Sequence, residues 1–148
     1  MERFSKLAQI QDGHYLILKS VATSGIESCG ILVGHIKDNV AHIDEVRKIR
    51  NISDRPQVEF IFDPTEYLDA ILDTDWYTEN ARYKLLGIWH VHPNVPGYPS
   101  TQDWRAAQAG KVIEGLYLIF TTLGDTIYKY YWDGEKFTVI QETNDATR

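Results

Sequence analysis

Apolar and polar positions along this chain predict alternating strands and helices. Apolar residues, many of them β-branched, are dense over Cys29–Ile36 and over Leu85–His92, which is typical of buried strands. Asn39–Ile49 is expected to pair with the first of these segments as a hairpin. Val58–Phe62 predicts a shorter strand. Leu116–Ile140 alternates aromatic and β-branched residues around two glycine-containing turns, so this segment predicts three more strands.

Three helices are predicted from their start and stop signals. Residues 13–24 predict a first helix that ends near Gly25, a common helix stop. Pro64–Asp73 predicts the second, because proline suits the first turn of a helix. Ser100–Ala109 predicts the third, after a loop that contains three prolines. The order helix, strands, helix, strand, helix, strands predicts an α/β fold, with a mixed β-sheet flanked by helices.

Length and charge narrow the possible functions. The 148 residues fit one domain, and the formal net charge of −6 argues against nucleic acid as a partner, because phosphate binding needs a basic face. A short basic run at Arg47, Lys48 and Arg50 reads as a solvated strand end. The start of the chain has no apolar segment typical of a secretory signal, and no apolar run of about 18 residues predicts a membrane span. We therefore expect a cytoplasmic protein with no membrane partner.

The cysteine and histidine content limits the kinds of metal site. A single cysteine, Cys29, excludes an internal disulfide, a zinc site of several thiolates and the paired cysteines of zinc nucleobase deaminases. Its place in an apolar strand predicts a small buried hydrophobe. His14, His35 and His42 read as structural or exposed residues. Any metal therefore needs ligands from the remaining histidines and from carboxylates.

Candidate chemistry concentrates between residues 90 and 103. On a strand, alternate residues face the same side, so His90 and His92 present two imidazoles to one point. If Ser100 caps the third helix, Asp103 lies in its first turn and can point back over the strand as a third ligand. Two histidines and one carboxylate leave a coordination position open for water, as in catalytic zinc sites.

Each half of this pattern also has an ordinary structural explanation. Paired histidines on a strand are commonly exposed or hydrogen-bonded, and Ser100-x-x-Asp103 is typical of a helix N-terminal cap. The two roles are compatible, because Ser100 can cap the helix while Asp103 binds a metal. Two histidines and a carboxylate also occur in iron oxygenases, so these residues alone leave the identity of the metal open.

The spacing His90-x-His92, seven residues, then Ser100-x-x-Asp103 resembles the JAMM motif of the JAB/MPN metalloprotease family. The likeness extends upstream, where Glu27 precedes a glycine-flanked apolar strand, and to Phe60-Ile-Phe-Asp-Pro, similar to a Phe-x-x-Asp-Pro element of the family. Valine replaces the common serine between the histidines, and we expect it to point away from the metal. The short chain resembles a minimal prokaryotic-type member.

The resemblance implies one JAB/MPN domain over residues 1–148, with the family's cytidine-deaminase-like three-layer sandwich. It implies Zn²⁺ held by His90, His92 and Asp103. It further implies that Glu27 is the general base for a zinc-activated water, and that the Ser100 hydroxyl stabilises the oxyanion.

The implied activity is that of an isopeptidase or peptidase that cleaves after the C-terminal glycine of a ubiquitin-like protein. Its partners would be such a protein or its conjugates, together with E1- and E2-like conjugating enzymes. Reversal of conjugation, antiphage defence and processing of a sulfur-carrier protein all fit this activity. The competing expectation is a non-catalytic scaffold of the same fold, although metal-less members lack ligands that are present here.

Overall fold

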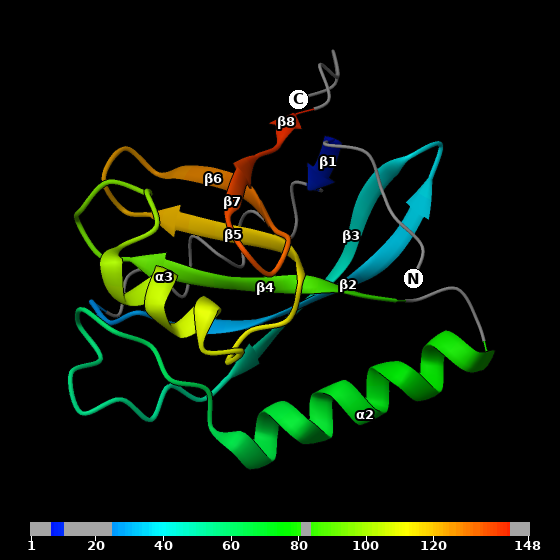
Figure 1. Cartoon of the computed structure of the whole chain (residues 1–148), viewed down its shortest axis with the longest axis horizontal. Helices are drawn as coiled ribbons and strands as arrows, with labels where there is room; N and C mark the ends of the chain where they lie inside the picture. Colours follow the sequence, from blue (N-terminus) through cyan, green and yellow to red (C-terminus); the bar gives the residue numbers. More distant parts are fainter. Residues whose placement is uncertain (1–6, 11–24, 81–83, 143–148) are drawn as a thin grey trace.

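The computed structural model describes residues 7–10, 25–80 and 84–142, and of these residues 7–10, 75–80 and 141–142 by their backbone alone. The described elements form a mixed sheet and two helices (Figure 1). Their bounds are β1 (Leu7–Ile10), β2 (Cys29–Lys37), β3 (Val40–Ile49), α2 (Pro64–Asn80), β4 (Lys84–His92), α3 (Thr101–Gln108), β5 (Gly115–Thr121), β6 (Thr126–Trp132), β7 (Phe137–Val139) and β8 (Gln141–Glu142). The helix predicted over 13–24 lies outside the described residues.

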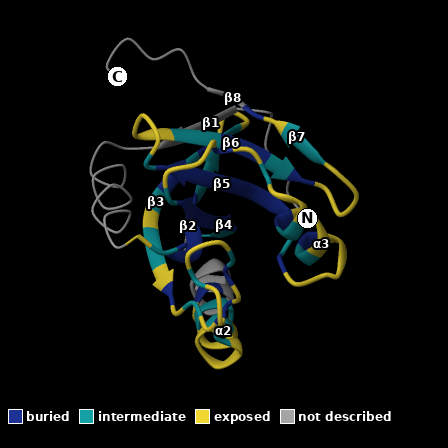
Figure 2. Cartoon of the chain, turned by 90° about the vertical axis from the view of Figure 1, so that its left-hand side faces the viewer, coloured by how far each residue is buried: buried dark blue, intermediate teal, exposed yellow. Residues whose placement is uncertain are grey.

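The sheet has the strand order β7-β6-β5-β4-β2-β3-β1-β8. The pairs β4–β5, β1–β3 and β1–β8 are parallel, and the other neighbours are antiparallel. This mixed pairing confirms the predicted α/β class. Strands β4 and β5 lie in the buried middle of the molecule (Figure 2).

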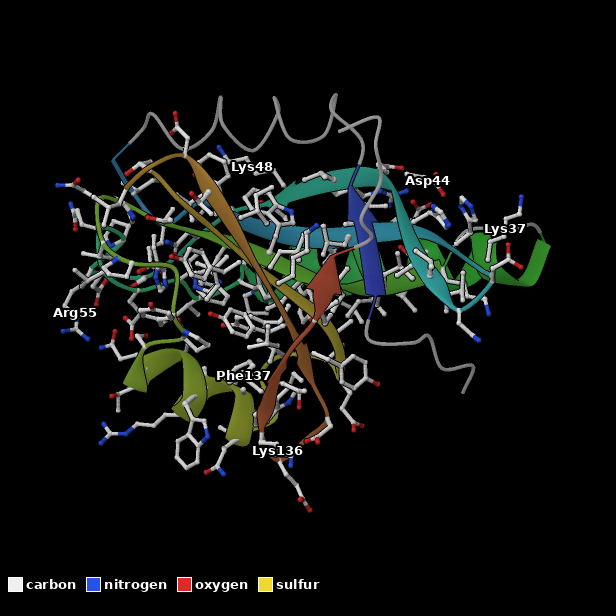
Figure 3. The ribbon with its side chains drawn as sticks, turned by 90° about the horizontal axis from the view of Figure 1, so that it is seen from above. Lys37, Asp44, Lys48, Arg55, Lys136 and Phe137 are labelled. Atoms are coloured by element: carbon white, nitrogen blue, oxygen red, sulfur yellow. The ribbon has the colours of Figure 1, made fainter. Side chains whose placement is uncertain are left out.

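The β2–β3 hairpin follows from its turn and its glycines. Asp38 and Asn39 both have positive φ, 53° and 63°, the backbone of a tight two-residue hairpin turn. At Gly30 and Gly34 a Cβ atom would lie 1.8 and 1.9 Å from backbone oxygens of β3, so no side chain fits there. Figure 3 shows this turn, marked by Lys37, at the end of the molecule opposite Arg55.

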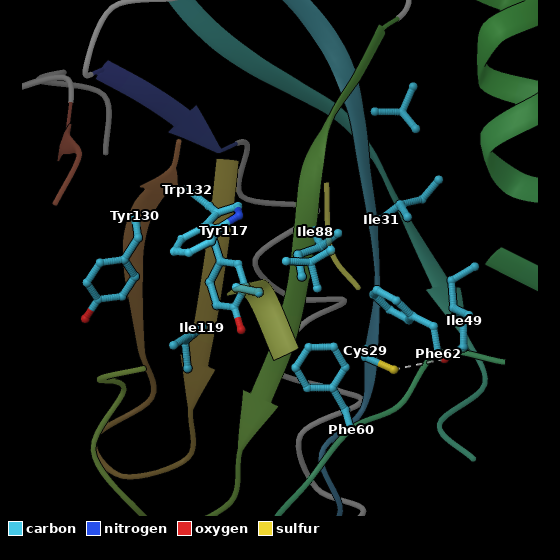
Figure 4. Packing of buried hydrophobic residues seen from close by; sticks show 13 residues of the cluster. Cys29, Ile31, Ile49, Phe60, Phe62, Ile88, Tyr117, Ile119, Tyr130 and Trp132 are labelled. Atoms are coloured by element: carbon cyan, nitrogen blue, oxygen red, sulfur yellow. Dashed lines mark hydrogen bonds between the residues drawn. The ribbon is translucent and has the colours of Figure 1, made fainter. Parts of the chain in front are cut away.

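Apolar side chains fill both faces of the sheet. Tyr67 and Ala70 of α2 and Ala107 of α3 pack against one cluster, so both described helices cover the same face (Figure 4). A second cluster, which includes Leu32 and Leu118, fills the opposite face. The predicted three-layer arrangement also depends on residues 13–24, outside the described part of the chain.

The strand predicted over Val58–Phe62 is wrong, because the segment is a loop with a single bridge between Asn51 and Phe62. Phe60 and Phe62 are buried on either side of the exposed Ile61, but Val58, which alternation would place beside them, is exposed. The hydrogen bonds differ from those of a strand: the Ile61 amide donates to the Asn51 side chain, 3.0 Å away. The apolar residues of this segment therefore predicted a strand whose backbone pairing the loop does not make.

The two described helices start within one residue of their predicted starts, at Pro64 and, with Ser100 as N-cap, at Thr101. Asp63 caps α2 by accepting from the amides of Thr65 and Glu66, and the helix runs to Asn80, seven residues beyond the predicted end. Thr74, the first residue beyond the predicted end, is fully buried and donates its hydroxyl to the Ala70 carbonyl. No helix in the described ranges is long and apolar enough to cross a bilayer.

Candidate metal centre

Strand β4 carries both histidines to the face that α2 and α3 cover. His90 and His92 are 0% and 3% exposed. Val91, between them, packs in the opposite cluster, as expected from strand alternation. Two imidazoles are thereby buried next to each other, with their Nε2 atoms 3.0 Å apart.

Helix α3 brings the carboxylate of Asp103 to these histidines. Ser100 Oγ accepts from the Asp103 amide at 3.0 Å, and Asp103 Oδ2 accepts from the Ser100 amide at 2.8 Å, which together form a capping box. The same Oδ2 atom lies 3.3 Å from His90 Nε2 and 3.1 Å from His92 Nε2. The helix cap therefore directs the carboxylate toward both histidines, so the cap leaves Asp103 placed where a ligand would have to be.

The loop between the histidines and α3 is fixed by β5 and β6. The Tyr130 hydroxyl donates to the Gly97 carbonyl at 3.0 Å, and the Thr121 hydroxyl donates to the Val95 carbonyl. These bonds anchor the middle of the loop, at Val95 and Gly97. The distance from His92 to Ser100 is consequently set by the sheet.

Glu27 joins the cluster through the register of the sheet. Cys29 of β2 pairs with His90 of β4, and Glu27, two residues earlier, faces the same side. Glu27 Oε1 lies 3.8 Å from His90 Nε2, is buried, and has no hydrogen-bond partner among the described residues. Ligand atoms from Glu27, His90, His92 and Asp103 all lie within 4.8 Å of one another. The described part of the chain shows no other such group.

The sequence matches the family model for prokaryotic homologues of the JAB domain over residues 15–132. This chain belongs to the prokaryotic JAB-domain family. It is also 37% identical over 135 residues to a desampylase of Pyrococcus furiosus, an alignment that covers 90% of this chain and 86% of the relative. A solution structure of a Desulfitobacterium hafniense protein matches with a TM-score of 0.69 and 22% identity, covers 94% of both chains, and supports the fold. The family predicted from the motif is confirmed.

The donor set of this JAB-domain protein fits a metal cation. His92 donates its Nδ1 hydrogen to the Pro96 carbonyl at 2.9 Å, which leaves the Nε2 lone pair directed into the cluster. Metal-binding histidines commonly use a backbone carbonyl in this way. The unpartnered Glu27 oxygen is a buried acceptor that a cation would satisfy. The group can therefore bind a metal ion.

Burial and charge shift the pKa values in this cluster in different directions. Burial, and then the nearby charge of Asp103, raise the pKa of Glu27 to about 8. Burial lowers the pKa of His90. For Asp103 burial acts upward, but the charge of His90 and the hydrogen bonds from His90, His92 and Ser100 hold its pKa well below the usual range. Burial acts downward on His92, but hydrogen bonds to Asp103 and Pro96 raise its pKa.

Two aromatic rings enclose His90. Phe60 stacks on the imidazole with ring centroids 4.3 Å apart, and Tyr117 meets it edge-on at 5.4 Å. Both belong to the cluster of Figure 4. No pattern in the sequence predicted that Tyr117 lies at the site. Phe60 was named only as part of the family-like element before α2. The rings exclude water from one side of the site.

Metal-free protein is expected to lose stability as the pH rises from about 5 to 8. The folded pKa of Glu27, about 8, exceeds its ordinary value of 4.5, so in this range the folded chain keeps a proton that the unfolded chain has released. Glu27→Gln removes this titration. Its melting temperature in chelator should exceed that of the wild type by about 5–10 °C at pH 8, and by much less at pH 5. If the difference in melting temperature between wild type and Glu27→Gln were the same at pH 5 and pH 8, the raised pKa of the buried Glu27 would be contradicted.

Proposed function

We propose that this JAB-domain protein is a zinc-dependent isopeptidase or peptidase that cleaves after the C-terminal glycine of a ubiquitin-like protein. The observation that carries the proposal is the buried group of Glu27, His90, His92 and Asp103. Its presence in a chain 37% identical to a desampylase supports a hydrolase acting on a modifier protein. We infer that residues 1–148 form one such domain, which the family match over 15–132 supports.

His90, His92 and Asp103 are the proposed zinc ligands, because their three closest donor atoms lie 3.0–3.3 Å from one another. Zinc bound in such a site supplies Lewis acidity, which lowers the pKa of water and polarises a carbonyl. The two nitrogens and one carboxylate oxygen match the ligands that zinc takes in hydrolases.

Glu27 is the proposed general base. Its free Oε1 atom faces the cluster at 3.8 Å from His90 Nε2, farther than the three ligand atoms lie from one another. It takes a proton from the attacking water and delivers it to the leaving amine. Its buried surroundings keep bulk water from competing for that proton.

A cavity of about 440 Å³ adjoins Asp103, between α3 and the loop that precedes α2. Its apolar lining includes Phe60, Phe62, Tyr67 and Val112. We propose this cavity as the binding pocket for an apolar side chain of the substrate tail, close to the scissile bond. An extended tail can bind there through main-chain hydrogen bonds with side chains in pockets.

Ser100→Ala is expected to lower kcat by about 10²–10³. Ser100 Oγ accepts from the Asp103 amide, so its own hydrogen remains available to donate to the oxyanion. Loss of the cap costs about 1 kcal/mol, too little to explain that rate loss. Ser100→Thr keeps the hydroxyl and the cap and should retain most activity. The two variants are compared by their kcat at equal zinc content. A Ser100→Ala enzyme with wild-type kcat would contradict the proposed role of the hydroxyl in stabilising the oxyanion.

The test of the proposed activity uses the native host. Tagged wild type and Glu27→Ala are expressed there, and lysines that carry a modifier's C-terminal remnant are compared by mass spectrometry. Remnants that accumulate only with Glu27→Ala support deconjugation and identify the modifier, and from it the E1- and E2-like enzymes. If remnants do not change while a free ubiquitin-like precursor accumulates, the activity is tail processing, as for a sulfur carrier. If neither changes, the proposed activity is wrong.

A further inference from the structure

We propose that Asn51 is a positioning residue that holds Glu27 in place over the metal centre. Asn51 lies two residues after the end of β3, and its side chain is hydrogen-bonded to backbone groups of other residues than the proposed ligands. The inference rests on the proposed function for the role of Glu27, but its structural part stands on hydrogen bonds alone.

The Asn51 side chain uses its whole hydrogen-bonding capacity on backbone groups. Its Nδ2 atom donates to the carbonyls of Glu27 and Glu59, each at 2.9 Å. Its Oδ1 atom accepts from the amides of Ser53 and Ile61, each at 3.0 Å. An amide side chain has two donor hydrogens and two acceptor lone pairs, so all four are satisfied. One side chain therefore joins the segment just before β2, which carries Glu27, to both sides of the loop after β3.

The Glu27 backbone depends on this loop. Glu27 lies two residues before Cys29, the first residue of β2, and its amide donates to the Pro56 carbonyl at 2.6 Å. Its carbonyl accepts from Asn51. Both polar backbone groups of the proposed base thus bind the segment 51–56. The position of its carboxylate is set by that segment.

The same side chain fixes the wall of the site. The loop held through Glu59 and Ile61 carries Phe60 between them, and Phe60 stacks on His90. Asn51 therefore sets the base, the aromatic wall and the histidine relative to one another. A shift of about 1 Å at a reacting group can cost 10²-fold in rate.

Two substitutions separate positioning of Glu27 from ordering of the loop. Asn51→Asp keeps both acceptor contacts, to Ser53 and Ile61, but removes the donors to the carbonyls of Glu27 and Glu59. Asn51→Ala removes all four bonds and adds no charge. Ile43→Val is the control for a loss of stability remote from the site, because Ile43 is fully buried in the cluster on the opposite face.

The experiment uses zinc-loaded full-length protein and three measurements: zinc content, amide hydrogen exchange by NMR, and kcat and KM. The kinetic probe is a branched peptide in which a Gly-Gly carboxyl acylates a lysine ε-amine. In both Asn51 variants we expect full zinc, an amide of Glu27 that exchanges at least about tenfold faster, and a kcat about 10–100-fold lower. The Ser53 and Ile61 amides should stay protected in Asn51→Asp and lose protection in Asn51→Ala. Ile43→Val should change none of these.

Wild-type kcat in Asn51→Asp, or an unchanged Glu27 amide in both variants, would overturn the inference. If Asn51→Ala does not fold, Asn51→Asp still decides it. If the wild type does not cleave the branched peptide, and if neither modifier remnants nor a precursor accumulate in the host with Glu27→Ala, the proposed function is wrong. The exchange of the Glu27 amide then still tests whether Asn51 positions that residue.

Discussion

Glu27→Ala and Glu27→Gln are expected to lose at least about 10³-fold in kcat while they keep their zinc and their fold. The Oε1 atom of this carboxylate lies beside the proposed ligands and has no hydrogen-bond partner among the described residues. Removing it therefore breaks no hydrogen bond that holds His90, His92 or Asp103. A general base that also returns the proton to the leaving group acts in two steps, so its loss affects both.

The measurement compares kcat on the branched peptide, zinc content by elemental analysis and melting temperature. Glu135→Gln is the matched control, because it removes the same charge from an exposed turn between β6 and β7. It should leave all three quantities unchanged. A Glu27→Gln enzyme with wild-type kcat would transfer the role of base to another group. A Glu27 variant without zinc would instead make Glu27 a ligand.

The arrangement of the candidate metal ligands was predictable because much of their geometry is local. Strand alternation brings His90 and His92 to one side, and a helix cap sets the direction of the Asp103 carboxylate. Glu27 differs, because its place depends on the pairing of Cys29 with His90 across the sheet. From the sequence alone it was assigned through the family resemblance. No periodicity within one segment encodes a register between two strands.

The loop after β3 shows what sequence patterns do not contain. Phe60 and Phe62 alternate with exposed residues as in a strand, but the Asn51 side chain replaces the neighbouring strand as hydrogen-bond partner. A side chain that satisfies four backbone groups leaves no trace in hydrophobic periodicity. The error over Val58–Phe62 and the unforeseen importance of Asn51 therefore have the same cause.

His92→Ala and Asp103→Asn are expected to lose zinc and to melt at the same temperature with and without added zinc. Wild type should melt higher with zinc, since a ligand present at about 1,000 times its Kd stabilises the native state by about 4 kcal/mol. Asp103→Asn is chosen because its amide oxygen still accepts from the Ser100 amide, so the helix cap survives while the ligand charge is lost. Both changes also remove a partner from a buried group, which adds to the loss of activity.

His35→Ala is the control for histidine loss as such. His35 pairs with Asp44 near the hairpin turn, at 2.5 Å, and that turn lies at the far end of the molecule from Arg55 and the loop after β3 (Figure 3). This variant should bind one zinc per chain and keep the zinc-dependent rise in melting temperature. One zinc per chain in His92→Ala would refute the ligand set. Zinc loss in His92→Ala with full retention in Asp103→Asn would leave the two histidines as ligands and restrict Asp103 to the helix cap. Because the cap and the ligand role share one oxygen atom, only this pair of variants distinguishes them.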